Sequence, residues 1–126
     1  MKRDMELIRQ ILLAVEAWPP GGGDYTFPEL GRDAADVEYS KHQARRSGLI
    51  DGLTLDPDID AEAEGPFTQV YGLTPAGHDF LDQARNPYVW DEAMAAIRDR
   101  GFRDASIDII KGLLDKFARK RLGLDS

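Results

Sequence analysis

A first helix is indicated by apolar residues that recur at steps of three and four near the start of the chain. They are Met5, Ile8, Leu12 and Val15. This spacing puts them on one side of an α-helix, as in a helix packed on a core. Asp4 is a suitable N-cap, with Glu6 in the first turn, where a negative charge is favourable. Trp18-Pro19-Pro20 should end the helix, because proline lacks an amide hydrogen and restricts the residue before it.

A short strand and a second helix are predicted next. Tyr25-Thr26-Phe27 alternates between apolar and polar residues, which favours a strand. Asp33 or Asp36 can cap the helix that follows, and this helix should run to about Ser47. Gly48 then suits the left-handed position that commonly closes a helix.

A β-hairpin is predicted in the middle of the chain. Two strand-like runs, 52–55 and 67–71, flank the acidic segment DPDIDAEAEGP from Asp56 to Pro66. Both runs are short and are bounded by turn-forming residues. The hairpin should therefore have a long, acidic tip.

Three further helices are expected after the hairpin. Thr74-Pro75 and Asn86-Pro87 each place a capping residue before a proline at the first helical position. Gly101 should stop the second of these helices. The last should begin near Ser106 and end in Arg119-Lys120-Arg121, because the helix dipole favours positive charge at that end.

This order of elements predicts an α+β fold. Helix, short strand, helix and hairpin in succession are typical of a winged helix-turn-helix, with the second helix as the recognition helix and the hairpin as the wing. We expect residues 1–126 to form a single winged-helix-like domain. Within it, 1–85 would be the core with a wing over 53–71, and 86–126 a C-terminal helical extension.

Composition excludes several classes of protein. The chain has 126 residues, is 42% hydrophobic and contains no cysteine. It is therefore rich enough in apolar residues to fold, and disulfides, thiolate chemistry and cysteine-zinc sites are ruled out. No apolar run is long enough to span a membrane, and the opening MKRDMELIRQ lacks the features of a signal peptide. We expect a cytoplasmic protein that does not bind membranes.

The net charge of -7 is concentrated in the predicted hairpin tip. Residues 56–85 carry 1 basic and 7 acidic side chains, whereas 86–126 carry 8 basic and 7 acidic ones. The overall charge argues against broad nonspecific binding to nucleic acid, although a local basic face remains compatible with it. A partner of the acidic tip is not expected to be a phosphate backbone.

Three blocks of sequence resemble an uncharacterised family of bacterial and prophage proteins, a domain of unknown function. The first block is the opening MKRDMELIRQILLAVE. The other two match through Val37, Tyr39 and Gly48-Leu49-Ile50, then through Leu73-Thr74, Gly77-His78-Asp79-Phe80-Leu81-Asp82, Arg85 and Trp90. The resemblance implies a small winged-helix-like protein from phage-related gene sets. It implies no established activity, and no catalytic residue follows from it.

The helix before the hairpin should present two different faces when its residues are placed about 100° apart. The inner face would carry Val37, Ser40, Lys41, Ala44 and Ser47. The outer side would carry Tyr39, His42, Gln43 and Arg46, with Glu38 and Arg45 flanking it. The candidate DNA-binding residues are Tyr39, His42, Gln43, Arg45 and Arg46, whose side chains suit base edges and phosphates. A solvated face or a protein contact is the alternative. This stretch is more polar than the family pattern, and Lys41 is expected to bury its stem while its charged end reaches water.

No motif of a catalytic or metal site is complete. Asp56-x-Asp58-x-Asp60 opens like a calcium loop, but Ala61 and Phe67 occupy the positions that need Gly and Glu. His78 has a neighbouring carboxylate but no nucleophile that can be placed beside it, so we expect a structural hydrogen bond there. We expect a non-enzymatic protein with no cofactor and no metal.

The last helix is apolar over an unusually wide arc, which predicts self-association. Its apolar residues cover about 180°, whereas a helix packed on one side needs little more than about 100°. We expect a homodimer whose interface contains Ile110, Leu113, Leu114 and Phe117. Packing against the helix that carries Trp90, Met94 and Ile97 within the same chain is the alternative.

Two functions are compatible with these observations. The first is a DNA-binding transcription regulator or phage-related accessory factor that contacts double-stranded DNA through the outer side of the recognition helix. The second is a protein–protein interaction module that uses the winged-helix scaffold without binding DNA. Fold alone does not separate them.

Overall fold

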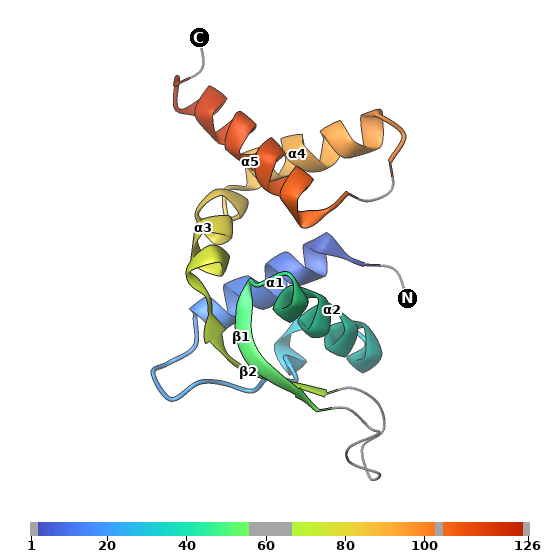
Figure 1. Cartoon of the computed structure of the whole chain (residues 1–126), viewed down its shortest axis with the longest axis vertical. Coiled ribbons are helices and arrows are strands. Elements are labelled where there is room, and N and C mark those ends of the chain that lie inside the picture. The colour runs from blue at the N-terminus through green and yellow to red at the C-terminus, as the bar shows by residue number, and fades with distance from the viewer. Residues whose placement is uncertain (1–2, 56–66, 103–104, 125–126) are drawn as a thin grey trace. The chain divides into compact units, whose positions relative to one another are not determined.

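A computed structural model describes residues 3–55, 67–102 and 105–124 (Figure 1). Over these residues the chain forms α-helices, one short 3₁₀-helix and a two-stranded antiparallel sheet, which confirms the α+β class. The elements in chain order are α1 (Met5–Glu16), η1 (Pro28–Leu30), α2 (Ala34–Arg46), β1 (Ile50–Leu55), β2 (Phe67–Leu73), α3 (Pro75–Ala84), α4 (Pro87–Asp99) and α5 (Ile107–Arg121).

The predicted helix starts are confirmed by side-chain caps. The N-cap side chains that accept backbone hydrogen bonds from the first turn are Asp4, Asp33, Thr74, Asn86 and Ser106. Such a cap contributes about 1 kcal/mol by satisfying an amide that has no partner within the helix. Local chemistry therefore sets where each helix begins.

The chain divides into two compact units, residues 1–78 and residues 79–126. The division falls inside α3, whereas we expected the core of the fold to extend to residue 85. We call these parts the N-terminal unit and the C-terminal unit.

The N-terminal unit has its core between α1, α2 and the hairpin. The buried residues of α1 are Met5, Leu7, Ile8, Ile11, Leu12 and Val15. This buried face includes the predicted stripe and is wider than it, because α1 packs against both α2 and β2. Phe27 closes one edge of the core, with its ring stacked on Trp18 at a centroid distance of 5.4 Å.

The predicted strand at Tyr25-Thr26-Phe27 is wrong. The Asp24 carboxylate accepts hydrogen bonds from the backbone nitrogen and the hydroxyl of Thr26, at 2.9 and 2.6 Å, and so holds a turn. Phe27 has a left-handed φ of 52°, and η1 follows it directly. An aspartate that bonds its own following backbone competes with strand pairing, and three alternating residues are too few to outweigh it.

The predicted hairpin is confirmed. Its strands are longer than the predicted runs 52–55 and 67–71: β1 begins at Ile50 and β2 ends at Leu73. Leu53 pairs with Gln69 and Thr54 with Thr68, and a bulge separates Asp51 from Gly52. A Cβ atom at Gly52 would lie 2.3 Å from the Gln69 carbonyl oxygen, so only glycine fits at the bulge.

The junction between α2 and α3 explains why two of the matched sequence blocks go together. Gly48 has a φ of 76°, and the Thr74 hydroxyl donates to its carbonyl at 2.5 Å while accepting from the amide of Gly77 at 2.9 Å. The backbone of Gly77 lies so close to Leu49 that a Cβ atom would approach the Leu49 carbonyl oxygen to 2.0 Å. The segments Gly48-Leu49-Ile50 and Leu73-Thr74-x-x-Gly77 therefore form one packed corner.

The C-terminal unit is built on the contact between α4 and α5. Its fully or nearly fully buried side chains are Phe80, Leu81, Ala84, Val89, Trp90, Ala93, Ile97, Ile107, Ile110 and Leu114. Phe80 and Trp90 meet edge to face, with centroids 6.3 Å apart. Packing of α5 on α4 thus occupies much of the wide apolar arc within the chain.

Candidate functional site

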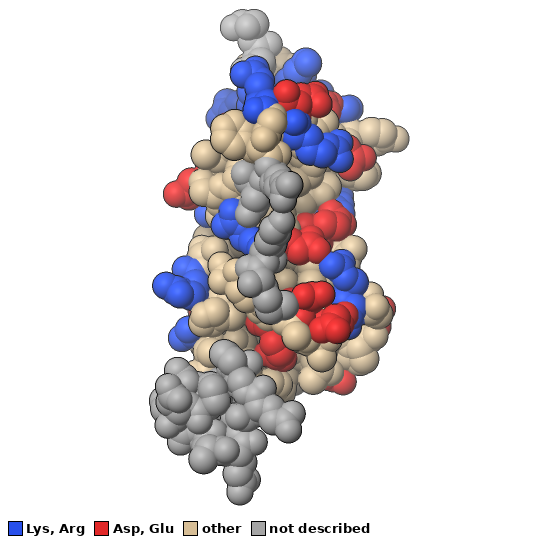
Figure 2. All heavy atoms as spheres, turned by 90° about the vertical axis from the view of Figure 1, so that its right-hand side faces the viewer, with Lys and Arg blue, Asp and Glu red and all other residues tan. Residues whose placement is uncertain are grey.

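Negative charge is concentrated in the N-terminal unit. Residues 1–78 contain 7 Lys and Arg against 14 Asp and Glu, whereas residues 79–126 contain 9 of each kind. The whole net charge of -7 is therefore carried by the unit that holds α2 and the hairpin. On the face drawn in Figure 2, the basic and acidic side chains of the described residues are interspersed, without a continuous basic area.

The two faces of α2 are arranged as predicted. Its buried residues are Val37, Ser40, Lys41 and Ala44. The five candidate DNA-binding residues lie outside this buried face: Tyr39, His42, Gln43 and Arg45 are half-buried, and Arg46 is exposed. The helix periodicity thus keeps all five out of the buried face of α2, although neighbouring segments partly cover four of them.

Two of these five side chains, those of Arg45 and His42, are less available to a partner than the others. Arg45 donates from Nε to the carbonyl of Gly52 at 3.0 Å, which ties the end of α2 to β1 beside the bulge. His42 has a buried Nδ1 without a hydrogen-bond partner among the described residues. Tyr39, Gln43 and Arg46 are therefore the members of the set that are freest to contact a partner.

The outer side of α2 is acidic at its start and basic at its end. Asp33 and Asp36 are both exposed in the first turn, and Arg45 and Arg46 lie in the last. This distribution suits the helix dipole, which favours negative charge at the N-terminus and positive charge at the C-terminus. It also means that the first turn of the predicted recognition helix presents carboxylates.

Lys41 is fully buried on the inner side of α2, so the expectation that its charged end reaches water is wrong. Its ammonium donates to the carbonyls of Tyr25 and Thr68, at 2.8 Å each, and pairs with the Glu38 carboxylate at 2.5 Å. The ammonium also lies 4.6 Å from the centroid of the Phe67 ring. All three of its hydrogens have an acceptor, which meets the requirement for burying a charge.

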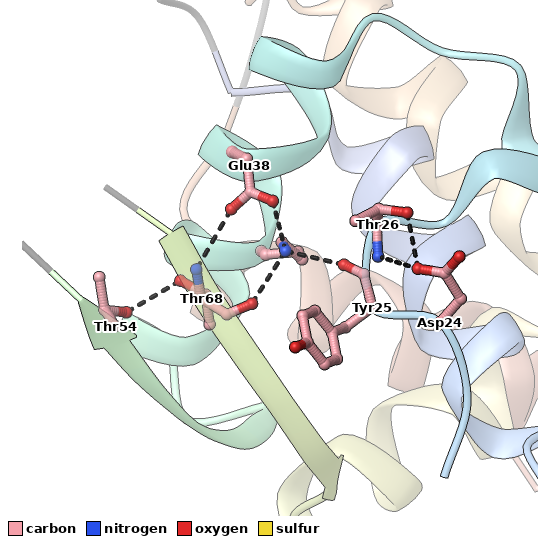
Figure 3. Close-up of polar contacts among 7 residues, drawn as sticks. Asp24, Tyr25, Thr26, Glu38, Thr54 and Thr68 are labelled. Carbon is pink, nitrogen blue, oxygen red and sulfur yellow. Dashed lines mark hydrogen bonds and ion pairs between the residues drawn. The ribbon is translucent and has the colours of Figure 1, made fainter. Parts of the chain in front are cut away.

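The Glu38 carboxylate links the same cluster to the hairpin (Figure 3). Its second oxygen accepts from the Thr68 amide at 3.2 Å, and the Thr68 hydroxyl shares a 2.9 Å hydrogen bond with that of Thr54 on β1. One lysine and one glutamate therefore join α2, β2 and the loop around Tyr25. We call Glu38, Lys41 and Thr68, with the Tyr25 carbonyl, the lysine anchor.

Burial lowers the pKa of Lys41, although the hydrogen bond and the charge of Glu38 oppose this shift, as does the charge of Asp24. The pairing keeps the ammonium form bound to three oxygens in a site without direct access to water. Such an arrangement holds elements in place, since no lone pair is left for nucleophilic or base chemistry.

The lysine anchor was missed at the level of sequence. The available signal was a lysine on the predicted inner face with a glutamate three residues before it on the same helix. The two carbonyl acceptors come from Tyr25 and Thr68, which are 16 and 27 residues away along the chain. Their approach depends on the tertiary fold.

The exposed side chains of the hairpin strands include apolar ones and one carboxylate, that of Asp51 on β1. Thr54 and Thr68 face the core side, so their neighbours Leu53 and Gln69 point the other way. Leu53 is 45% exposed and Tyr71 is 64% exposed. Neither β1 nor β2 contains a lysine or an arginine.

The four residues of the expected dimer interface differ in accessibility. Ile110 and Leu114 are fully buried within the chain, whereas Leu113 and Phe117 are half-buried. Packing against α4 accounts for the first pair, as the intrachain alternative requires. Self-association remains a prediction, and only Leu113 and Phe117 of the four would be able to reach a second copy.

The other residues considered in the sequence analysis are His78, the basic run of α5 and the calcium-like segment. The side chain of His78 is exposed and makes no hydrogen bond among the described residues, so the structural hydrogen bond expected for it is not found there. In the basic run at the end of α5, Arg119 pairs with Asp115 at 3.0 Å and Arg121 with Glu92 at 2.5 Å. The calcium-like segment 56–60 lies outside the described residues.

Over the parts of the chain that are described, no three His, Asp or Glu side chains come together as metal ligands would. None of the described helices combines the length and apolar character that crossing a bilayer requires.

Comparison with known proteins identifies the family. A family model described as "Hypothetical protein (DUF2513)" matches residues 2–103. A protein of Haemophilus influenzae strain Rd, described as "Uncharacterized protein", is 32% identical over 114 residues, which cover 88% of this chain and 90% of that protein. No solved structure matches the chain. Because the family model spans most of the chain and the Haemophilus relative covers nearly all of it, the chain belongs to the DUF2513 family.

Proposed function

We propose that the N-terminal unit is a winged-helix-like scaffold that binds a partner protein with a basic surface. The order of α1, α2 and the hairpin supports this scaffold, with the single turn of η1 in the place of a middle helix. The observation that carries the choice of partner is charge, since residues 1–78 hold 14 acidic side chains against 7 basic ones.

Duplex DNA is disfavoured by the same charges. DNA-binding proteins gain most of their affinity from Lys and Arg contacts to phosphates, and a wing runs close to the backbone. The strands of this hairpin carry neither residue. Recognition helices also approach bases with their N-terminal residues, where α2 presents Asp33 and Asp36.

A basic protein surface fits these features better. The exposed acidic side chains between residues 24 and 36 are Asp24, Glu29, Asp33 and Asp36. Charge complementarity of this kind speeds association and selects partners, and its effect weakens with salt. The exposed Leu53 and Tyr71 of the hairpin supply apolar contact area of the sort that interfaces bury.

Binding of double-stranded DNA is the second candidate. It is favoured by the outward position of Tyr39, Gln43 and Arg46, whose side chains can contact phosphates and base edges. No catalytic role is proposed for any residue.

The test begins with labelled duplex DNA, titrated at low and at physiological salt. We expect no salt-sensitive binding at micromolar protein. Salt-sensitive binding that is lost in Arg46→Ala would favour the DNA candidate instead. Arg46 is the suitable position because Arg45 also holds the hairpin, so its removal would confuse stability with binding.

The protein partner is tested by charge reversal. Proteins that cross-link to the chain in cells are first identified and purified. Each is then titrated with the wild-type chain and with the double variant Glu29→Lys/Asp36→Lys. Both positions are exposed, so the fold should tolerate the change. We expect affinity to fall about tenfold or more in this variant, and to be unchanged in the matched control Asp91→Lys/Asp99→Lys of the C-terminal unit. Equal losses in both variants would contradict the proposed surface.

A further inference from the structure

The C-terminal unit contains a groove that the proposed function does not use. Its cavity volume is about 550 Å³, and it is formed by the end of α4, by Phe102, Ala105 and Ser106, and by one stripe of α5. Its apolar lining includes Ile97, Phe102, Ile109, Leu113 and Phe117. Phe102 is 63% exposed and Ile109 57% exposed, so large apolar surfaces are left uncovered there.

The groove also has a charge preference. The lining contains two ionisable side chains, Arg100 and Lys116, and both are cationic. Neither is paired with a carboxylate among the described residues, and the Lys116 ammonium lies 5.7 Å from the centroid of the Phe117 ring. A ligand that fills the groove would therefore meet apolar surface together with two positive charges that no carboxylate of the described residues pairs with.

We propose that this groove binds a small free amphiphile with an apolar body and a carboxylate head. The volume lies within the range of about 300–1,000 Å³ that is usual for small-ligand sites, and such sites combine an apolar lining with few polar groups. The stripe from Ile109 to Phe117 runs for about 12 Å along α5, which suits an extended chain. Arg100 and Lys116 supply the partners for a carboxylate.

A second copy of the chain is a poorer occupant. In a two-fold interface the same patch meets itself, so a groove that carries Arg100 and Lys116 would meet a second groove with the same two positive charges. Like charges brought together in an interface oppose association, and no lining carboxylate is present to offset them. The groove thus complements an anion better than it complements itself.

Calorimetric titration of the full chain tests this assignment. The probes are decanoate below its micelle concentration, and decanol, which has the same chain length without the charge. We expect one decanoate to bind per chain, about tenfold more tightly than decanol. Arg100→Gln/Lys116→Gln should remove the preference for decanoate and leave the binding of decanol unchanged.

Ile109→Glu places a repelling charge in the groove at an exposed position, so the fold is preserved. We expect it to abolish decanoate binding, whereas Tyr71→Glu, the same change at an exposed site of the N-terminal unit, should leave it intact. The proposal is overturned if decanol binds as tightly as decanoate, or if Ile109→Glu has no effect. It is also overturned by a concentration-dependent dimer that decanoate does not dissociate, or by binding to phosphatidylglycerol vesicles without binding to monomeric decanoate.

Discussion

The two compact units bury different kinds of side chain. All the buried polar side chains of the described residues, Ser40, Lys41 and Thr68, belong to the N-terminal unit. The buried side chains of α4 and α5 are apolar, and the charged ones there pair at the surface, as Arg121 does with Glu92.

The N-terminal unit is specified partly by directional hydrogen bonds, and the contact between α4 and α5 by apolar packing. The hydrogen bonds that Lys41 donates are directional, so the carbonyls of Tyr25 and Thr68 must lie at fixed places beside α2. Apolar packing of α5 on α4 is non-directional and leaves part of the wide apolar arc of α5 uncovered. The first unit is thus held in one arrangement by a few residues, and the second retains uncovered apolar surface.

The largest expected effect comes from removing the lysine anchor. Lys41→Ala leaves the Glu38 carboxylate and two carbonyls without their partner, so the N-terminal unit should lose about 3 kcal/mol or more of stability. Urea unfolding followed by Trp18 fluorescence in a Trp90→Phe background reports on this unit alone, since the chain has 2 tryptophans.

A double-mutant cycle identifies the cause of that loss. Combining Lys41→Met with Glu38→Gln should cost less than the sum of the two single changes, because the second change removes the charge that the first leaves unpaired. Additive costs would mean that Lys41 acts through packing alone. The signal of Trp90, measured in a Trp18→Phe background, should not move in any of these variants.

The second prediction concerns the corner between α2 and α3. Gly77→Ala would drive a methyl group into the Leu49 carbonyl, which is backbone and cannot rotate away, so we expect a loss of about 1–3 kcal/mol. Gly112→Ala on α5 is the matched control, because no atom lies within 4 Å of its added Cβ. That control should gain about 0.5–1 kcal/mol through helix propensity. Equal effects at the two glycines would contradict the close approach.

The third prediction is a pH dependence at the start of α1. Burial acts to raise the pKa of Asp4, but hydrogen bonds from the Leu7 amide and Arg32 outweigh it, so the pKa lies below its ordinary value of 3.8. A carboxylate with a lowered pKa stabilises the fold above that value, and the contribution disappears as the pH falls through the lowered pKa. Asp4→Asn keeps a capping side chain and should remove this dependence, flattening stability between neutral and acidic pH. If stability depends on pH in Asp4→Asn as it does in the wild type, the Asp4 carboxylate does not make this contribution.

Features that depend on residues close together in the sequence could be predicted, whereas features that depend on distant segments could not. Asp4, Thr74 and Asn86 cap helices through contacts within four residues, and the inner face of α2 follows from periodicity, so these were predicted correctly. The turn at Asp24 was equally local but was missed, because alternation over three residues was preferred to aspartate's turn chemistry.

Features that need the tertiary fold could not be predicted in this way. The acceptors of Lys41 come from distant segments, and the sequence showed only that a lysine fell on the wrong face for its charge. The groove arises where α4, Phe102 and α5 meet, and the wide apolar arc of α5 indicated uncovered surface without its shape or its charges.

The smallest expected effect distinguishes Ser40 from its neighbour Lys41. Ser40 is 1% exposed, and its hydroxyl has no hydrogen-bond partner among the described residues, whereas every hydrogen of the Lys41 ammonium has one. Ser40→Ala therefore removes an unsatisfied buried group and adds helix propensity, so stability should stay equal or rise by about 0.5 kcal/mol.

Urea unfolding on the Trp18 signal measures this change against Thr68→Val, which breaks hydrogen bonds of a satisfied buried hydroxyl and should be destabilising by about 1 kcal/mol. If Ser40→Ala costs as much as Thr68→Val, the Ser40 hydroxyl has a partner in solution, and the anchor extends further along α2 than its direct contacts. If it does not, the buried polar groups of α2 that stabilise the N-terminal unit are those that join it to other segments.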